Sequence, residues 1–286
     1  MARTTIGLLH PGDMGGVVGA CAVAAGSRVL WASEGRSVGT RGRAAAGALE
    51  DVGALAALVA ASDVILSICP PHAALEQARA VAALRFGGLY VDGNAVAPAT
   101  ARAIGEVVEQ GGAAFVDGGI IGPPPRSAGS TRLYLSGREA KRVVALFESS
   151  ALEAIVVNDT PGAASALKMS YAAYTKGVSA LLMAIRALAA SEGVDEALLE
   201  EWRRSQPELP KRSEAGARDS ARKAWRFVGE MEEIAATFEG AGLPGGFHEA
   251  CAQIYERLAE YKDAATTPTL RDLVAPLTRP RSARPR

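Results

Sequence analysis

The chain has 286 residues, with 31 basic and 31 acidic side chains and a formal net charge of zero at pH 7. This balance excludes the broad basic surface that nucleic acids and anionic membranes require, so the expected partner is a small-molecule substrate. The length allows two domains, each with its own core. The three cysteines are widely spaced in apolar segments, which argues against a disulfide framework or a zinc site, and no metal is expected.

The first residues lead directly into an apolar strand, which argues against a secretory signal. No uncharged apolar run reaches the roughly 18 residues that a membrane helix needs. Together with the cysteine usage, these features predict a cytoplasmic protein. At the other end, residues 278–286 are rich in arginine and proline without apolar periodicity, and we expect a disordered basic tail over residues 273–286.

Short apolar strands alternate with helical patterns through the first half of the chain. Such runs, separated by amphipathic helices, are typical of a parallel sheet covered on both faces. The sequence therefore predicts an α/β fold, with a doubly wound, Rossmann-type nucleotide-binding domain over residues 1–160. Its strands are expected at residues 4–9, 28–32, 63–68, 88–92 and 113–117, with extensions of the sheet at 132–136 and 154–157.

The pattern changes after Gly162, where residues 163–193 contain no proline and are rich in alanine and leucine. One long helix is expected there. Further helical segments at 196–204, 213–239 and 246–261 follow, separated by prolines and by a glycine-rich break. Residues 161–272 are therefore predicted to form an all-α domain that contributes to substrate binding and forms a homodimer.

The first strand ends in a glycine turn that opens an alanine-rich helix. Gly12 leaves room for a pyrophosphate to approach the helix N-terminus, and Gly15 permits close packing of helix and strand. His10 stands where the first glycine of the full dinucleotide fingerprint is expected. The turn, with Asp13 and Met14 between its glycines, predicts a cofactor site, and a purely structural strand-turn-helix is the alternative.

The residues after the second strand bear on which dinucleotide is bound. Ala32 occupies the place where an acidic residue would hold the adenosine ribose of NAD. Ser33 and Arg36 offer a hydroxyl and a guanidinium suited to a 2′-phosphate, so NADP(H) is favoured over NAD(H). Glu34 is the counter-evidence, because it could hold a ribose and would repel a phosphate.

Four spaced motifs carry a resemblance to a known family. They are the turn at 12–15, Ser67-Ile68-Cys69-Pro70-Pro71, the segment 92–98, and Gly162-Ala163-Ala164-Ser165-Ala166-Leu167-Lys168. Over residues 4–180 the sequence resembles the β-hydroxyacid dehydrogenases, which are related to 6-phosphogluconate dehydrogenase and to imine reductases. Residues 195–265 resemble a C-terminal domain of unknown function. The resemblance implies an oligomeric, cytoplasmic enzyme that transfers a hydride between a nicotinamide cofactor and a small hydroxy acid, with Lys168 as general acid/base.

The chemistry of the residues agrees with a catalytic role for Lys168, since an ammonium on a rigid helix can protonate the alkoxide that hydride addition creates. A lysine that extends from an apolar helix to solvent is the alternative. Cys69, Pro70 and Asn94 follow strand ends and are predicted to line the cofactor pocket. The alternatives, which give the same sequence, are strand termination for Pro70 and turn stabilisation for Asn94.

Two departures from the family's pattern concern the substrate. Ile121, followed by Gly122, stands where relatives have a serine that holds a substrate carboxylate, and Ala172 replaces an asparagine one turn beyond the lysine. A larger or less anionic substrate is therefore plausible. Tyr171 is a further candidate for substrate contact, with aromatic core packing as the alternative. His248 is a candidate for contact from a partner subunit, with a structural role at the helix start as the alternative.

Two other functions stay open alongside the hydroxyacid dehydrogenase hypothesis. The apolar Ile120-Ile121 pair favours imine reduction. The replacements at His10, Ile121 and Ala172 would also fit a sensor or scaffold that binds NADP(H) without catalysis.

Overall fold

The computed structural model describes residues 3–279, which divide into two compact units between Met169 and Ser170. The division falls inside helix α7 (Ala163–Ser191), later than the boundary at residue 160 expected from sequence. Lys168 therefore belongs to the first unit, and most of α7 belongs to the second.

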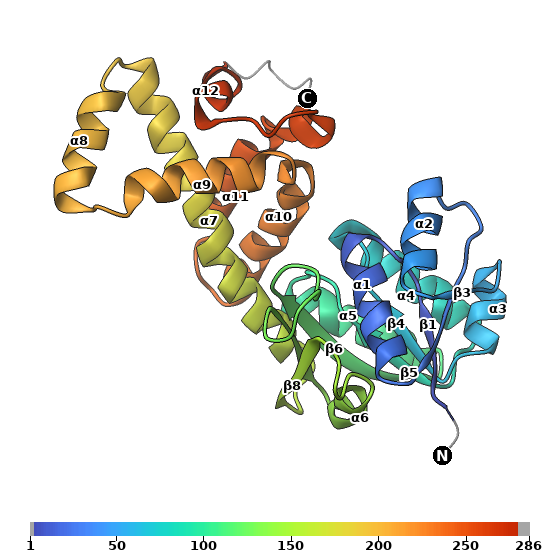
Figure 1. Ribbon diagram of the computed structural model, residues 1–286. Coiled ribbons are helices and arrows are strands. Elements are labelled where there is room, and N and C mark those ends of the chain that lie inside the picture. The colour runs from blue at the N-terminus through green and yellow to red at the C-terminus, as the bar shows by residue number, and fades with distance from the viewer. Residues whose placement is uncertain (1–2, 280–286) are drawn as a thin grey trace, which may run out of the picture. The chain divides into compact units, whose positions relative to one another are not determined.

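The first unit is built on one eight-stranded sheet with the order β3-β2-β1-β4-β5-β6-β7-β8 (Figure 1). The order reverses between β1 and β4, which is where doubly wound sheets bind their ligands. The strands are β1 (Thr5–Leu8), β2 (Arg28–Trp31), β3 (Glu50–Asp51), β4 (Val64–Ser67), β5 (Leu89–Asp92), β6 (Ala114–Ile121), β7 (Thr131–Ser136) and β8 (Leu152–Asn158).

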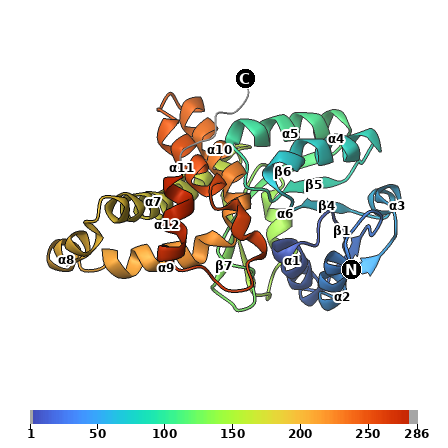
Figure 2. The same ribbon diagram turned by 90° about the horizontal axis from the view of Figure 1, so that it is seen from above.

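Helices cover both faces of this sheet, as Figure 2 shows from above, and each face has its own apolar cluster. One cluster includes Val18 and Ala22 of α1 and Val143 of α6, and the other includes Ala78 of α4 and Ile104 of α5. This is the buried parallel sheet that the apolar runs predict. The helices of the unit are α1 (Asp13–Ala24), α2 (Val38–Ala46), α3 (Leu55–Ala60), the 3₁₀ helix η1 (Pro71–Ala73), α4 (Ala74–Ala83), α5 (Pro98–Gln110) and α6 (Ala140–Ala145).

The sheet differs from the prediction at its two edges. β3 was not predicted, because its two residues are charged and exposed and carry no apolar signal. At the other edge, β7 pairs antiparallel to β6, and β8 pairs parallel to β7. The extension of the sheet by these two strands is as expected, while their direction reverses that of the parallel core.

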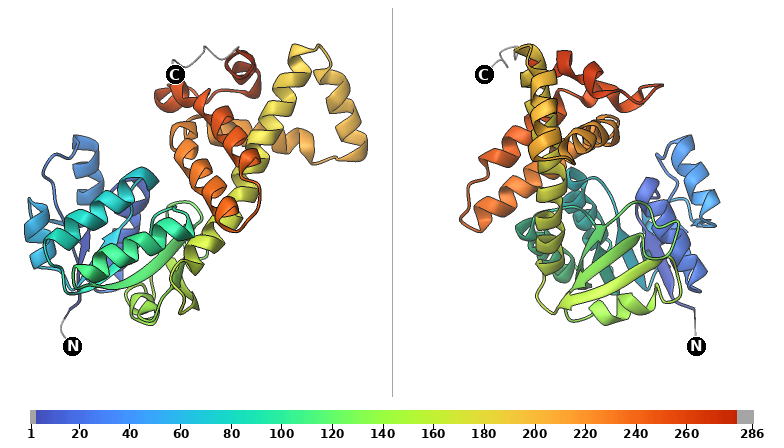
Figure 3. Two further views of the ribbon diagram at one scale, coloured as in Figure 1. Left: turned by 180° about the vertical axis from the view of Figure 1, so that it is seen from behind. Right: turned by 60° about the vertical axis from the view of Figure 1, so that its left-hand side comes forward.

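The second unit consists of helices packed around α7, the long yellow-green helix of Figure 3. The segment predicted as one helix at 213–239 is two helices, and Pro210 lies in the first turn of α9 instead of separating helices. Proline costs little there, because a first-turn N–H has no partner within the helix. The helices after α7 are α8 (Asp195–Ser205), α9 (Leu209–Ala221), α10 (Ala224–Gly240), α11 (Gly246–Glu256), the 3₁₀ helix η2 (Ala259–Asp263) and α12 (Leu270–Thr278).

Helix α12 corrects the expectation of a disordered tail from residue 273. Thr269 and Asp272 form a capping box at its start, and Leu273 and Leu277 are buried. These contacts stabilise the helix through Thr278, although Pro276 lies within it. The rest of the predicted tail, residues 280–286, lies outside the described residues.

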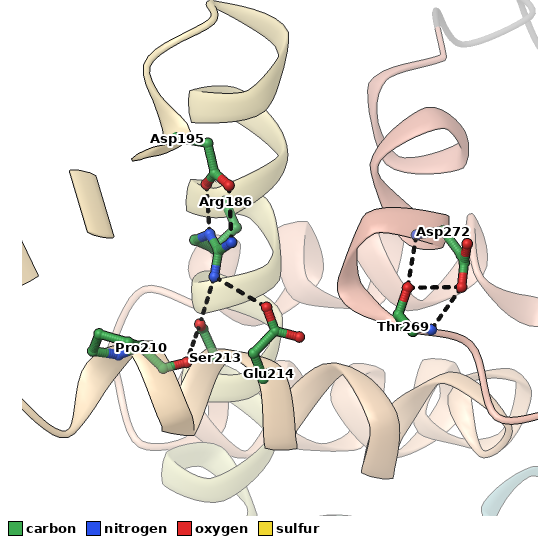
Figure 4. A network of polar contacts seen from close by, with 7 residues as sticks. All are labelled: Arg186, Asp195, Pro210, Ser213, Glu214, Thr269 and Asp272. Carbon is green, nitrogen blue, oxygen red and sulfur yellow. Dashed lines mark hydrogen bonds and ion pairs between the residues drawn. The ribbon is translucent and has the colours of Figure 1, made fainter. Parts of the chain in front are cut away.

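A buried arginine joins three helices of the second unit (Figure 4). The Arg186 side chain on α7 is 7 % exposed and makes two hydrogen bonds to the Asp195 carboxylate, with N···O distances of 2.5 and 2.9 Å. Its Nη1 also donates to the Ser213 hydroxyl at 3.0 Å and approaches Glu214 at 3.5 Å. The paired fork geometry makes this a strong charge-assisted contact.

Replacing Arg186 with methionine is therefore expected to destabilise the second unit. The substitution keeps much of the apolar stem but leaves the Asp195 carboxylate without its bidentate partner, at a cost of about 2–4 kcal/mol. Chemical denaturation monitored by circular dichroism measures the change. An unchanged free energy of unfolding would show that the arginine contributes no net stability.

Candidate cofactor and proton-donor site

The glycine turn has the geometry of a phosphate cradle. Gly12 is the N-cap of α1, and a Cβ atom there would meet nothing within 4 Å. A Cβ atom on Gly15 would instead lie 2.1 Å from the carbonyl oxygen of His10. The turn is thus packed tightly on its inner side and open above the first-turn N–H groups, which have no acceptors within the helix.

His10 replaces a glycine without backbone strain, because it does not adopt a positive φ angle. Burial and the nearby positive charge of Arg36 lower the pKa of His10 to about 4, so the imidazole is neutral at pH 7. Its Nδ1 atom is buried and has no hydrogen-bond partner among the described residues. An unsatisfied polar atom beside the cradle fits a site that a polar ligand completes.

Three arginines surround the turn and the end of β2. Arg36 Nη2 donates to the Leu9 carbonyl at 3.3 Å, and Arg43 Nε donates to the Pro11 carbonyl at 3.3 Å. Arg41 Nη2 donates to the Ser33 carbonyl at 3.0 Å. Of the three, only Arg36 is predicted from the sequence to bind the cofactor. Arg41 and Arg43 follow closely on Ser37, the N-cap of α2.

The Ser33 hydroxyl is already hydrogen-bonded within the protein. The Ser33 side chain is buried, and its hydroxyl bonds to the carboxylate of Asp51. Guanidinium groups thus lie near the turn and the end of β2, while the Ser33 hydroxyl is already engaged. The negative charge of Asp13 would repel an anion at the turn, but it is partly compensated by Arg43, whose Nη1 lies 3.5 Å from the Asp13 carboxylate.

A small cavity of about 80 Å³ lies beside the end of β2. Its walls combine apolar side chains with three polar ones, which suits a flat aromatic base with polar edges. It is lined by Leu9, Ala32, Leu55, Leu58, Glu34, Arg36 and Gln77.

Asn94 ties the ends of β4 and β5 together. Its side chain is 2 % exposed. Its Oδ1 accepts from the Cys69 backbone N–H at 2.6 Å, and its Nδ2 donates to the Ser67 hydroxyl at 3.1 Å and to the Asp92 carboxylate. The amide thus fixes the Cys69 loop at the rim, and its contact with the cofactor stays a prediction.

The same loop carries Cys69 and Pro70, the two other residues predicted to line the cofactor pocket. Burial, together with the Asp92 carboxylate, raises the pKa of the Cys69 thiol to about 12. The thiol is therefore protonated and does not act as a nucleophile near neutral pH. Pro70 is exposed at the start of η1.

Lys168 lies where α7 packs against Gly119 of β6. A Cβ atom on Gly119 would lie 2.7 Å from the Ala164 carbonyl oxygen and 2.8 Å from the Lys168 Cβ. Only glycine in the strand permits this crossing. The lysine stem therefore packs directly on the carboxyl-terminal half of β6, in the same unit as the glycine turn.

A buried carboxylate fixes the start of α7 one turn before Lys168. Asp117 is fully buried and accepts hydrogen bonds from the Ser165 N–H at 3.0 Å, the Ser165 hydroxyl at 2.6 Å and the Ser136 hydroxyl at 2.9 Å. The Ser136 hydroxyl in turn accepts from the Ala164 N–H at 3.1 Å. Negative charge at a helix N-terminus is favourable, so this network anchors the helix that carries the lysine. Asp117 was not among the site residues predicted from sequence.

The residues predicted to contact substrate lie in different surroundings. Ile121 is 4 % exposed at the end of β6, and Gly122 has a φ of +127° with no room for a side chain. Tyr171 is 49 % exposed on α7. His248 is 5 % exposed within the helical unit, where its ring packs on Phe238. The Nδ1 atom of His248 is buried and has no hydrogen-bond partner among the described residues, and its contact with substrate stays a prediction.

Part of the sequence matches known proteins. Residues 189–258 match a domain of unknown function, DUF1932. An uncharacterized 28.5 kDa protein from the 7S RNA 5′ region of Methanothermus fervidus is 33 % identical over 147 residues, or 50 % of this chain and 54 % of that protein. The match therefore spans about half the length of this relative.

Solved structures match over nearly the whole chain. A conserved protein of unknown function, described as structurally similar to 3-hydroxyacid dehydrogenases, is 26 % identical with a TM-score of 0.67, covering 90 % of this chain and 98 % of that one. The 3-hydroxyisobutyrate dehydrogenase of Mycobacterium tuberculosis is 18 % identical with a TM-score of 0.66, covering 97 % and 100 %. The imine reductase of Streptomyces aurantiacus is 17 % identical with a TM-score of 0.55, covering 96 % and 100 %.

The chain thus has the fold of the 3-hydroxyacid dehydrogenases and imine reductases, with a Rossmann-type N-terminal domain and a helical C-terminal domain. More particularly, its helical domain matches DUF1932 over residues 189–258, which overlap the region predicted at 195–265 to resemble a domain of unknown function. Both parts of the resemblance seen in the sequence are confirmed. No helix within residues 3–279 is both long and apolar enough to cross a membrane.

Proposed function

We propose that the chain is an NAD(P)-dependent oxidoreductase that favours NADP(H). It transfers a hydride between the nicotinamide and a small carbonyl or hydroxy compound, with Lys168 as the general acid/base. The observation that carries the proposal is the placement of an open glycine cradle after β1 and a lysine packed on β6 in one unit. Both lie toward the carboxyl edge of the same sheet, where such folds bind ligands.

The residues present fit a dinucleotide. The N–H groups at Met14 and Gly15 would hold the pyrophosphate, the cavity at Leu55 would hold the base, and Arg36 and Arg43 would hold a 2′-phosphate. When bound, the nicotinamide supplies or accepts the hydride. The neutral His10 beside the turn places no positive charge of its own on the pyrophosphate.

Lys168 performs the proton transfer in this proposal. Its Nζ donates a proton to the carbonyl oxygen as that oxygen gains negative charge, and removes the proton in the reverse direction. Asp117 and Ser165 hold the first turn of α7, and Gly119 lets the helix lie close on β6, so the lysine stem starts from a fixed position. Such preorganisation reduces the reorganisation needed during the reaction.

The substrate is proposed to be less anionic than a short hydroxy acid. Ile121 cannot donate the hydrogen bond that a serine gives to a carboxylate in relatives, and its side chain is buried. The apolar Ile120-Ile121 pair keeps imine reduction as the second candidate function.

The test is an assay of NADPH oxidation by the full chain with separate panels of aldehydes and ketones and of cyclic imines, and of NADP⁺ reduction with 3-hydroxy acids. Turnover of a carbonyl or hydroxy compound supports the main proposal, and turnover of imines alone supports the second. Binding of NADPH without turnover in any panel would contradict both and favour a cofactor-binding sensor or scaffold.

The arginine group makes a prediction about cofactor choice. Replacing Arg43 with glutamine is expected to weaken NADPH binding by about 10- to 100-fold, because a charge-assisted contact to the 2′-phosphate contributes about 1.5–3 kcal/mol. NADH lacks this phosphate, so its affinity should change little. Isothermal titration with both cofactors measures the two effects, and an equal loss for both would argue against a 2′-phosphate site.

A further inference from the structure

We propose that a second cavity of the first unit, named here the Arg85 cavity, binds a small carboxylate with an apolar body. This cavity has a volume of about 290 Å³, whereas the cavity beside the end of β2 has about 80 Å³. Pockets that bind small molecules have volumes from about 300 Å³ upward. None of its residues takes part in the proposed hydride transfer, so the inference goes beyond the proposed function.

Helix α3 presents different faces to the two cavities. Leu55 and Leu58, which are three residues apart, line the cavity beside the end of β2. Ala56, Val59 and Ala60 line the Arg85 cavity instead. A ligand in the Arg85 cavity therefore does not occupy the place proposed for the cofactor base.

The Arg85 cavity lies at the amino-terminal edge of the sheet. Two of its lining residues show this, since Ser62 lies two residues before β4 and Gly88 lies directly before β5. The glycine turn follows the carboxyl-terminal end of β1, at the other edge. Binding in this cavity is therefore separate from binding of the dinucleotide.

Apolar side chains form part of the cavity wall. Val59 and Phe86 are buried, whereas Leu84 is 41 % exposed. A Cβ atom on Gly87 would meet nothing within 4 Å, so there is open space beside this residue. The apolar body of a ligand in the cavity would remove part of Leu84 from water, which is favourable.

Arg85 is the one charged residue among the described residues that line the cavity. Its side chain is exposed, and it makes no hydrogen bond, ion pair or ring contact with any residue in the range 3–279. The backbone does not require an arginine there, because Arg85 follows the C-cap of α4 with a φ of +56°, a position that favours glycine. The guanidinium is therefore available to an anion, and its planar fork matches a carboxylate.

Two backbone N–H groups add donors beside the guanidinium. Within the part of the chain that the structure describes, the N–H groups of Gly87 and Gly88 have no hydrogen-bond acceptor. Asp63, which is next to Ser62 in the sequence, does not line the cavity, and its carboxylate accepts from the Thr5 N–H at 2.8 Å. Donors without an opposing negative charge, next to an apolar wall, are the combination that a carboxylate with an apolar body requires.

Isothermal titration of the full chain with sodium hexanoate at millimolar concentration tests the proposal. Hexanoate is expected to bind at one site per chain. Inorganic phosphate and 1-hexanol should each bind at least tenfold more weakly, because phosphate lacks the apolar body and hexanol lacks the charge that pairs with the guanidinium. Phosphate binding as tightly as hexanoate would show a simple anion site and would overturn the proposal.

Arg85→Gln is expected to weaken hexanoate binding at least tenfold, because the charged partner of the carboxylate is lost. Arg85→Gly removes the same group and suits the backbone conformation, so its thermal unfolding midpoint should not fall. A loss of binding in this variant therefore cannot result from unfolding. Ala60→Trp, which adds a large side chain at an exposed position lining the cavity, should abolish binding.

Arg79→Gln serves as the matched control, since Arg79 is an exposed arginine of α4 that does not line the cavity. Its hexanoate affinity should equal that of the wild type. Absence of hexanoate binding to the wild type, or unchanged affinity in both Arg85 variants, would overturn the proposal. Neither result would bear on cofactor binding, which is measured separately with NADPH.

Discussion

Replacing Lys168 with methionine is expected to lower kcat by about 10²- to 10⁴-fold, the range typical for loss of a general acid/base. Methionine keeps an unbranched side chain on the tight crossing over Gly119 but has no proton to transfer. The affinity for NADPH should stay within about twofold of the wild type, because the glycine turn lies elsewhere on the sheet. Steady-state kinetics on the best substrate of the panel, with a parallel NADPH titration, measures both.

Lys168→Arg distinguishes proton transfer from simple charge stabilisation. A guanidinium keeps the positive charge but remains protonated in proteins, so it should recover little of the lost rate if proton exchange matters. Full activity in Lys168→Met, on a substrate that the wild type turns over, would disprove the catalytic role of the lysine. Activity restored by arginine alone would reduce that role to electrostatics.

Alanine substitutions at the two glycines of the turn should affect different properties, NADPH affinity at Gly12 and stability at Gly15. Gly12→Ala adds a methyl group in open space above the helix N-terminus, so folding should be unaffected while the pyrophosphate loses its approach. We expect NADPH affinity to fall by at least 100-fold. Gly15→Ala would place a Cβ atom 2.1 Å from the His10 carbonyl oxygen, which forces the turn to move and costs about 1–3 kcal/mol of stability.

Gly16→Ala is the matched control for both substitutions. Its Cβ atom would make only ordinary contacts, the nearest at 3.5 Å to Arg43 Cβ. Thermal unfolding and NADPH titration of all three variants separate the two kinds of failure. If Gly12→Ala bound NADPH as tightly as the wild type, the dinucleotide would not lie on this turn.

The elements that can be predicted from the sequence are those whose buried residues recur at regular spacing. The apolar strands and the amphipathic helices between them predict the parallel sheet, and the proline-free, alanine-rich stretch predicts α7. The glycine turn is recognisable because the contacts that require glycine there involve residues close in sequence. Gly15 is required by the carbonyl only five residues before it.

The features missed from sequence depend on contacts between distant residues. β3 forms because Glu50 and Asp51 pair with β2, where the Glu50 carboxylate also makes an ion pair with the Arg28 guanidinium. The direction of β7 follows from its hydrogen bonds to β6. Helix α12 has a readable capping box at Thr269 and Asp272, but its stability comes from the burial of its leucines, which the arginine-rich end of the chain obscures.

In the candidate site too, local motifs are predictable from the sequence and contacts between distant residues are not. Lys168 is recognisable from its motif, whereas its support by Asp117 and Ser165 spans 48 residues of chain and becomes visible only in the folded unit. The position of Asn94 after a strand predicts a ligand contact, and the fold adds that its amide joins two strand ends. The position of His248 at a helix start predicts substrate contact from a partner subunit, and the fold adds that its ring packs against Phe238.

The most direct test of the account is a calorimetric titration of the purified wild-type chain with NADPH and with NADH under identical conditions. One site per chain, with NADPH bound at least tenfold more tightly than NADH, is the expected result, because the cradle at Gly12 serves both cofactors and the arginines serve only the 2′-phosphate. Absence of binding by either cofactor would contradict the central claim that this unit holds a nicotinamide dinucleotide.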